Sequence, residues 1–178
     1  MKKIILLNLQ QFAEAVQGKQ IVYLFRPLSK ASTAAATLMA FTTENERSVT
    51  KDADSTATKS GSIRTPGVAE VEITASAIVS KGDTLMSDLE SAMNKDELVE
   101  CWEVNRAEPG ETENEGKYKA KYYQGYITEL TLSSSAEDMA EYSITYGANG
   151  QGADGYATLS EEQEEAADYA FADTTQKA

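Results

Sequence analysis

The chain has 178 residues, of which 41% are hydrophobic, and this size suits a single domain with a buried core. Its 29 acidic and 16 basic residues give a formal net charge of −13, which argues against a surface that grips nucleic acid phosphates or anionic lipid. A single cysteine excludes an intramolecular disulfide, and the absence of histidine removes the commonest general base and metal ligand. Because no apolar segment reaches the length of a membrane span, we expect a cytoplasmic or particle-assembled protein.

Short apolar runs separated by polar segments predict about seven β-strands. The clearest period of two lies at 68–79, where Val71 and Ile73 face one way and Glu70, Glu72 and Thr74 face the other. The other main strands are expected at 20–26, 36–44, 98–105, 117–133 and 138–150.

Two of the later strands repeat this separation into an apolar face and a solvent-facing polar face, here called the wet face. Their wet-face residues are Glu141, Ser143 and Thr145 in the strand at 138–150, and Glu129 and Thr131 in the strand at 117–133. Gly125, in the middle of the longer strand, predicts a bulge or a bend. The alternation predicts two faces but does not say which of them would point inward in an assembly.

Two helices are expected beside the strands. Apolar residues at helical spacing predict an amphipathic helix at about 84–94, with Asp83 as its N-cap. Ser160 and Gln163 match a capping box and predict a C-terminal helix at about 160–171. Because strands and helices do not alternate, we predict a mainly β fold, an antiparallel β-sandwich or barrel with one flanking α-helix.

The polar stretch at 50–67, TKDADSTATKSGSIRTPG, admits three interpretations: a metal loop, a solvated hairpin, or an arm that another subunit holds. A calcium-binding loop that starts at Asp52 needs glycine and glutamate at positions where this chain has Ala57 and Ile63. Asp52 and Asp54 alone are therefore a weak indication of a metal site.

No group of residues predicts catalysis. Glu70 and Glu72 share the wet face of one strand, and nothing in the sequence supplies the apolar cleft that a catalytic pair of carboxylates needs. The segment GANGQGADG at 147–155 lacks the lysine and the hydroxyl residue of a phosphate-binding loop, so it is interpreted as a flexible connection. We expect no enzymatic activity, no cofactor and no metal.

Four segments carry a resemblance to a known family. The segments KDADSTATKSGSIRTPG, VEITASAI, KYKAKYYQGYITELTLSSSAED and ANGQGADGYATLSEEQ are similar to the major tail protein of long-tailed, non-contractile phages of Gram-positive bacteria. The resemblance extends from about residue 18 over most of the chain, and the opening LNLQQFAE also resembles the start of several phage structural proteins. This family is structural and brings no catalytic residues.

The resemblance implies a subunit of a tail tube, in which six copies form a ring and stacked rings conduct the genome. It implies that the chain assembles with itself and with tape measure, tail terminator and distal tail proteins, in the host cytoplasm, and ends in the virion tail. Double-stranded DNA would pass through the lumen without specific binding. The implied division is an N-terminal arm at 1–19, a β domain at 20–150 and a C-terminal arm at 151–178.

The resemblance also gives a role to two sets of residues. The stretch at about 44–63 would be a long β-hairpin arm that reaches the adjacent ring through Thr50, Lys51, Asp52, Asp54, Thr56, Thr58 and Lys59. The wet faces would line the lumen through Glu70, Glu72, Thr74, Glu129, Thr131, Glu141, Ser143 and Thr145.

Each assignment has an alternative. The arm is alternatively an ordinary solvated hairpin, and the wet faces are alternatively an outer surface on which acidic residues only confer solubility. The alternative function is a monomeric β-sandwich that binds carbohydrate or a host surface.

Overall fold

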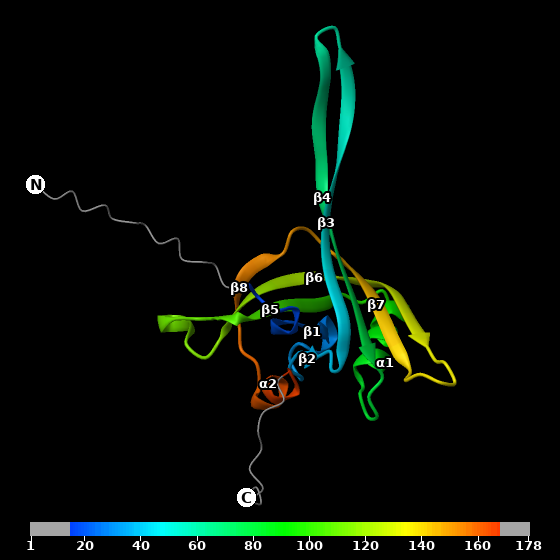
Figure 1. Cartoon of the computed structure of the whole chain (residues 1–178), viewed down its shortest axis with the longest axis vertical. Coiled ribbons are helices and arrows are strands. Elements are labelled where there is room, and N and C mark those ends of the chain that lie inside the picture. The colour runs from blue at the N-terminus through cyan, green and yellow to red at the C-terminus, as the bar shows by residue number, and fades with distance from the viewer. Residues whose placement is uncertain (1–14, 168–178) are drawn as a thin grey trace, which may run out of the picture.

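The computed structural model describes the backbone of residues 15–167 and the side chains of residues 15–164. Within this part of the chain, eight strands form one antiparallel sheet in the order β2-β1-β5-β6-β7-β4-β3, with β8 paired to β6 (Figure 1). The strands are β1 (Ile21–Pro27), β2 (Thr37–Leu38), β3 (Thr42–Thr58), β4 (Gly61–Ile78), β5 (Val99–Pro109), β6 (Tyr118–Ser133), β7 (Glu141–Ala148) and β8 (Ala153–Ala157). The helices are α1 (Leu85–Asn94) and α2 (Glu161–Ala167), with single 3₁₀ turns at Gly18–Gln20, Leu28–Lys30 and Thr112–Asn114. The predicted antiparallel, mainly β fold is confirmed.

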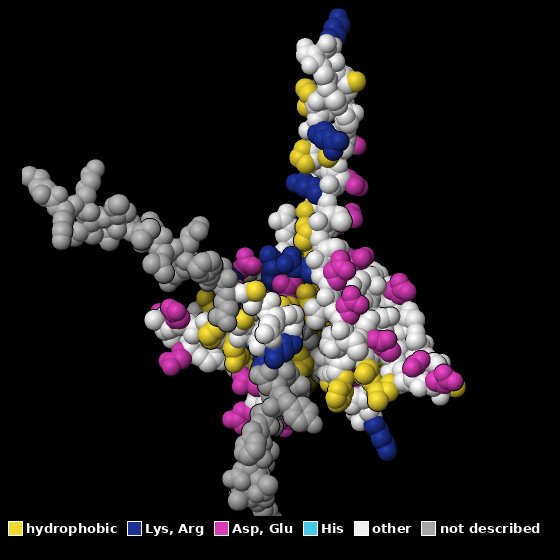
Figure 2. Space-filling model, in the orientation of Figure 1, with side chains coloured by type: hydrophobic (Ala, Val, Ile, Leu, Met, Phe, Trp, Pro, Cys, Tyr) yellow, Lys and Arg dark blue, Asp and Glu magenta, His cyan; other side chains and the backbone are white. Residues whose placement is uncertain are grey.

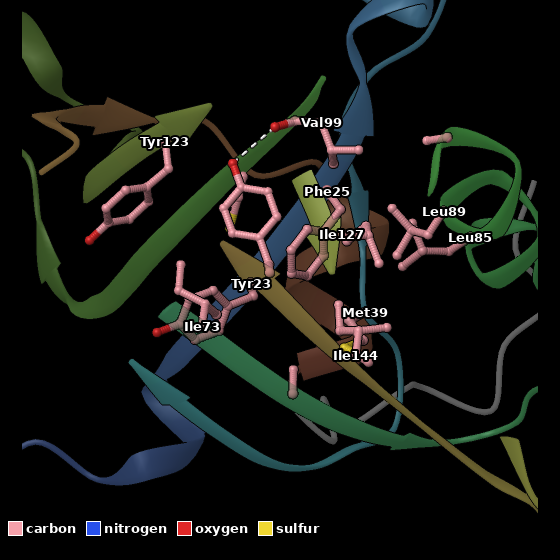
Figure 3. Close-up of a cluster of buried hydrophobic side chains, with 14 of the residues drawn as sticks. Tyr23, Phe25, Met39, Ile73, Leu85, Leu89, Val99, Tyr123, Ile127 and Ile144 are labelled. Atoms are coloured by element: carbon pink, nitrogen blue, oxygen red, sulfur yellow. Dashed lines mark hydrogen bonds between the residues drawn. The ribbon is translucent and has the colours of Figure 1, made fainter. Parts of the chain in front are cut away.

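The sheet curls so that β1 and β5 face β4 and β7 across a common core (Figure 3). Phe25 of β1 and Tyr146 of β7 are fully buried and meet edge to face, with ring centroids 6.0 Å apart. The Tyr146 hydroxyl donates a hydrogen bond to the Val99 carbonyl of β5 at 2.9 Å, which satisfies the polar end of the ring inside the core. Burial raises the pKa of this hydroxyl above its ordinary value.

Helix α1 packs against this core and confirms the helix predicted at about 84–94. Its apolar stripe, Leu85, Leu89 and Ala92, is buried against residues of β1 and β6. The N-cap position is Thr84, one residue after the predicted Asp83, but the Asp83 carboxylate accepts a hydrogen bond from the Leu85 N–H at 2.8 Å and so satisfies a backbone donor of the first turn.

The strand predicted at 36–44 is interrupted. Residues Thr37–Leu38 form the short β2 beside β1, and β3 then starts at Thr42. The break falls at Phe41, whose φ of 52° lies in the left-handed region and is incompatible with a continuous strand.

The segment interpreted as a flexible connection contains β8, so that interpretation was wrong for its last residues. From Tyr122↔Ala153 to Tyr118↔Ala157, β8 pairs with β6. Main-chain hydrogen bonds hold this strand, and they need no apolar side chains, which explains why hydrophobic patterning missed it. Leu159, just beyond β8, is buried in a second apolar cluster with Leu24, Val104 and Ala120.

Helix α2 follows with the predicted capping box. The Ser160 N–H donates to the Gln163 side-chain carbonyl at 3.0 Å, and the Gln163 N–H donates to the Ser160 hydroxyl at 3.3 Å. The Gln163 amide also donates to the Ala36 carbonyl at 2.8 Å, which ties the start of α2 to the segment before β2. The predicted helix at 160–171 is present as far as Ala167, and the rest of it lies outside the described residues.

Gly125 is the point at which β6 passes from one half of the sheet to the other. It is paired with Val99 of β5 and also with Ala148 of β7. A Cβ atom at this position would lie 2.1 Å from the Gly147 carbonyl oxygen, a distance at which a rigid backbone group must move. Gly125 is therefore required by a close backbone approach that admits no side chain, whereas the bulge of β6 lies further along, between Ile127 and Glu129.

Replacing Gly125 with Ala is expected to destabilise the fold by about 3 kcal/mol or more, because the added methyl group overlaps backbone atoms of Gly147 and Ala148 in β7. Gly155→Ala is the matched control, since no atom lies within 4 Å of its Cβ position. Chemical denaturation of both variants would show a large shift in midpoint for Gly125→Ala alone. Equal denaturation midpoints for the two variants would contradict the steric requirement for glycine at position 125.

Candidate assembly surfaces

A face rich in carboxylates and hydroxyls, here called the polar face, runs across three strands. It consists of Glu70, Glu72 and Thr74 of β4, Glu129 and Thr131 of β6, and Glu141, Ser143 and Thr145 of β7. On β4 these residues alternate with the buried Val71, Ile73 and Ala75, as a period of two requires. The structure thus brings all eight of the predicted wet-face residues onto one surface.

The strand register places these residues in rows. Thr145 of β7 lies opposite Thr74 of β4 and opposite Glu129 of β6. Ser143 lies in the next row, opposite Ser76 and Thr131. Directly opposed residues of neighbouring strands lie on the same face, so the polar face is continuous from β4 to β6.

A bulge on β6 makes this continuity possible. Ile127 pairs with Tyr146 and points into the core. Leu130, three residues later, pairs with Ile144 and points into the core as well, although a regular strand would turn it outward. The register shift between Ile127 and Glu129 inserts Thr128, and the inserted residue reverses the direction of every side chain that follows it. Without this bulge, Glu129 would point into the core.

Part of the polar face lies on β3 and was not predicted from the sequence. Glu44 lies opposite Ser76, Glu46 opposite Thr74 and Ser48 opposite Glu72. Their spacing of two was present in the sequence, but this segment was divided between a strand ending at residue 44 and the arm. The polar face therefore extends over a fourth strand.

The carboxylates of the polar face are not neutralised within the described part of the chain. None of its six glutamates forms an ion pair there. Their hydrogen bonds come from hydroxyl groups: Thr43 donates to Glu141 at 2.6 Å and Thr131 donates to Glu129 at 3.3 Å. A negative, hydroxyl-rich surface of this kind repels polyanions.

The second candidate surface is the free end of the β3–β4 hairpin, here called the arm. Pairing of β4 with β7 ends at Val71↔Ala148, while pairing of β3 with β4 continues to Thr58↔Gly61. Beyond the body the two strands form an isolated ribbon (Figure 1). The free ribbon is thus about 51–69, shifted along the chain from the predicted 44–63, because residues 44–50 are still part of the sheet edge.

All seven residues predicted to make contacts are exposed on the β3–β4 hairpin: Thr50 lies at the sheet edge just before the arm, and the arm carries Lys51, Asp52, Asp54, Thr56, Thr58 and Lys59. Main-chain hydrogen bonds between the two strands hold the arm together, and the Thr58 hydroxyl adds a bond to the Gly61 carbonyl at 2.6 Å beside the turn. An exposed two-stranded ribbon of this kind is at most marginally stable in isolation.

At the base of the arm, an ion pair connects the two halves of the sheet. The Arg47 guanidinium of β3 contacts the Glu103 carboxylate of β5 at 2.6 Å, and the Tyr23 hydroxyl of β1 donates to the same carboxylate at 2.9 Å. Burial and the adjacent negative charge of Glu103 raise the pKa of Tyr23 above its ordinary value. This network fixes the strand from which the arm departs.

Among residues 15–164, no group of three or more potential metal ligands lies close enough together to bind an ion. Asp52 and Asp54 therefore have no third ligand nearby in this region. The helices in the described part of the chain are also too short or too polar to cross a bilayer.

A curled antiparallel sheet with a long hairpin is also found in known proteins that resemble this chain. Residues 15–154 match the family model of the phage tail tube protein. The chain belongs to the phage tail tube protein family. A relative from Staphylococcus phage phiMR25, described as a putative tail protein, is 37% identical over 143 residues, which are 79% of this chain and 74% of the relative. The resemblance seen in the sequence is thereby confirmed, and the chain is a structural subunit of a tail tube.

Solved structures of tube proteins have the same fold. The SPP1 tail tube subunit superposes with a TM-score of 0.71 at 21% identity, covering 92% of this chain and 96% of the other. The tail of an empty gene transfer agent particle, refined with helical and C6 symmetry, gives a TM-score of 0.58 at 14% identity and covers 82% of this chain and all of the other. A sheath–tube complex of an extracellular contractile injection system gives 0.53 at 14% identity, covering 83% and 95%.

Proposed function

We propose that six copies of this tail tube subunit form a ring, and that stacked rings make a hollow tube with the polar face turned toward the lumen. The observation that carries the proposal is the continuity of the polar face over β3, β4, β7 and β6, with carboxylates that no cation neutralises in the described part of the chain. The C6 symmetry of the gene transfer agent tail, which has the same fold, supports the ring of six.

Electrostatics explains why such a face suits a conduit for double-stranded DNA. Each ring would repeat every carboxylate six times around a confined space, where like charges keep the phosphates away from the wall. The neighbouring threonine and serine hydroxyls keep the wall wetted. DNA would therefore pass through the lumen without specific binding, and the subunit would serve as a structural protein rather than an enzyme.

The arm supports stacking. Its strands carry small polar residues that stay soluble before assembly and offer their backbone and side chains to a neighbour afterwards. We assign the arm, through Lys51, Asp52, Asp54, Thr56, Thr58 and Lys59, together with the adjoining Thr50, to contacts with the adjacent ring. In such a contact, one surface of a subunit binds a different surface of a subunit in the next ring. A heterologous contact of this kind repeats along an axis and produces an open filament.

The same proposal covers the organisation and the setting of the chain. We assign residues 1–19 to an N-terminal arm and start the tube body at residue 20. The body was predicted to end at residue 150, but β8 is paired with β6 and Leu159 is buried, so we extend it to about residue 159. Tape measure, tail terminator and distal tail proteins would meet the tube along its axis and at its ends, and assembly would take place in the host cytoplasm.

Size in solution tests this function against a monomeric binding module. At rising protein concentration, analytical ultracentrifugation is expected to show rings and then long particles, and negative-stain images of the same samples should show hollow tubes of one diameter. A chain that remains monomeric at the highest soluble concentration would contradict the proposal.

A further inference from the structure

The two ends of the β3–β4 hairpin carry complementary chemistry. The arm lies at one end, and at the other end β3 and β7 begin while β4 and β6 finish. Four large apolar side chains are exposed at this second end, which we call the far end: Phe41 (67% exposed), Val79 (40%), Leu132 (56%) and Met139 (74%). Figure 2 shows an apolar patch at the opposite end of the body from the arm.

Hydrogen bonds and strand pairing place the far-end residues next to one another. The Ile78 N–H donates to the Phe41 carbonyl at 3.1 Å, and the Val79 N–H donates to the Ala140 carbonyl at 2.8 Å, one residue from Met139. Leu132 is paired with Tyr142 of β7. The apolar residues thus come from four chain segments that meet at the far end, and they are grouped rather than scattered, which is typical of a protein interface.

Acidic side chains border the far end. Glu137 and Asp138 are exposed in the connection between β6 and β7, directly before Met139, and Glu141 follows at the start of β7. One exposed cation, Lys81, lies in the nearby connection between β4 and α1. The far end is therefore apolar in its centre with a net negative border.

The arm has the opposite charge. Residues 50–67 contain three cations, Lys51, Lys59 and Arg64, against two carboxylates, whereas the whole chain has a formal charge of −13. None of these cations forms an ion pair in the described part of the chain. The arm also exposes two apolar side chains: Val68 (85% exposed) lies at the register shift near its base, and Ile63 (60% exposed) is paired with Thr56 and so lies on the same side as Asp54.

The two acidic residues of the arm lie on the other side of the ribbon. Lys51 is an odd-numbered residue of β3, and Arg64 of β4 lies directly opposite Ser55, another odd-numbered residue of β3. Because odd-numbered positions of β3 share one face, both cations lie on that face. Asp52 and Asp54 belong to the even-numbered set, on the same side as Glu70 of the polar face. In Figure 2 the magenta side chains of the arm follow its right edge, whereas the dark blue ones lie at its tip, near its middle and at its left edge.

We propose that the basic face of the arm docks on the far end of a second copy of this chain, with Glu137 and Asp138 as the partners of its cations and the exposed apolar residues of the far end buried in the contact. The arm and the far end are opposite ends of the same two strands, so this contact propagates head to tail along the strand direction. The inference rests on the proposed stacking of rings and names the surface that receives the arm.

Charge exchange tests the docking surface. In the arm variant, Lys51, Lys59 and Arg64 are changed to Glu; in the far-end variant, Glu137 and Asp138 are changed to Lys. Each variant alone is expected to raise the concentration needed for polymerisation at least tenfold, because like charges then meet across the contact. The combined variant is expected to recover most of the loss, since opposite charges meet again. Thermal unfolding of all three proteins controls for the fold, because every changed side chain is exposed.

The outcomes separate this inference from the proposed function. Polymerisation of both single-surface variants at the native concentration, or no recovery in the combined variant, would overturn the docking surface and leave tube formation standing. If the unmodified chain fails to polymerise, both the proposed function and the docking surface are overturned.

Discussion

Excising the arm is expected to leave a folded subunit that no longer polymerises. The structure gives the cut points: Thr50 and Glu70 are directly paired, so residues 51–69 can be replaced by Asn-Gly, which closes a two-residue hairpin. The excised residues are exposed, apart from the half-buried Ala69, and contribute none of the buried core residues. Arg47 and its ion pair with Glu103 remain in place.

The two consequences of the excision are measured separately. Thermal unfolding followed by circular dichroism should give a melting temperature within a few degrees of that of the full chain, because little apolar area leaves the core. Sedimentation and negative-stain microscopy should show no tubes at concentrations at which the full chain polymerises. Tubes of normal length from the shortened chain would show that the arm does not join the rings.

Reversing the charge of the polar face is expected to block DNA passage while tubes still assemble. Changing Glu70, Glu72 and Glu141 to Lys raises the net charge of each subunit by six without altering a buried side chain. In a confined lumen these lysines would bind phosphates that the glutamates repel. We expect virions with such tails to lose infectivity at least tenfold, with partial recovery as rising ionic strength screens the attraction.

A matched variant separates the lumen from charge in general. In this control, lysine replaces Glu111, Glu113 and Glu115, which lie on the exposed turn between β5 and β6 and not on the polar face. The net charge rises by the same six units. Tails built from this control should eject DNA normally. If the polar-face variant also ejects its genome normally, the polar face belongs to the outside of the tube.

Those parts of the fold that follow from side-chain alternation were predictable from the sequence. Val71, Ile73 and Ala75 alternate with the acids of β4 because one face of the sheet is buried and the other is wet. The amphipathic stripe of α1 and the capping box of α2 are equally local signals, read over a few neighbouring residues.

What the sequence did not reveal depends on pairing between distant segments. The bulge at Thr128 reverses the faces of β6, and only its alignment with β7 shows that Glu129 joins Thr145 on one surface. Strand β8 is held by main-chain pairing with β6, and its side chains carry no periodic signal. The far end is assembled from four segments, so no single stretch of sequence indicates it.

The most direct test is a helical reconstruction by cryo-electron microscopy of tubes formed by the purified chain. The proposed function predicts rings with six-fold symmetry, with β3, β4, β6 and β7 forming the inner wall and the side chains of Glu72, Thr74 and Thr145 directed at the lumen. It also predicts that the arm of each subunit crosses to the adjacent ring. A map in which these side chains lie on the outer surface, or in which the arm stays within its own ring, would contradict it.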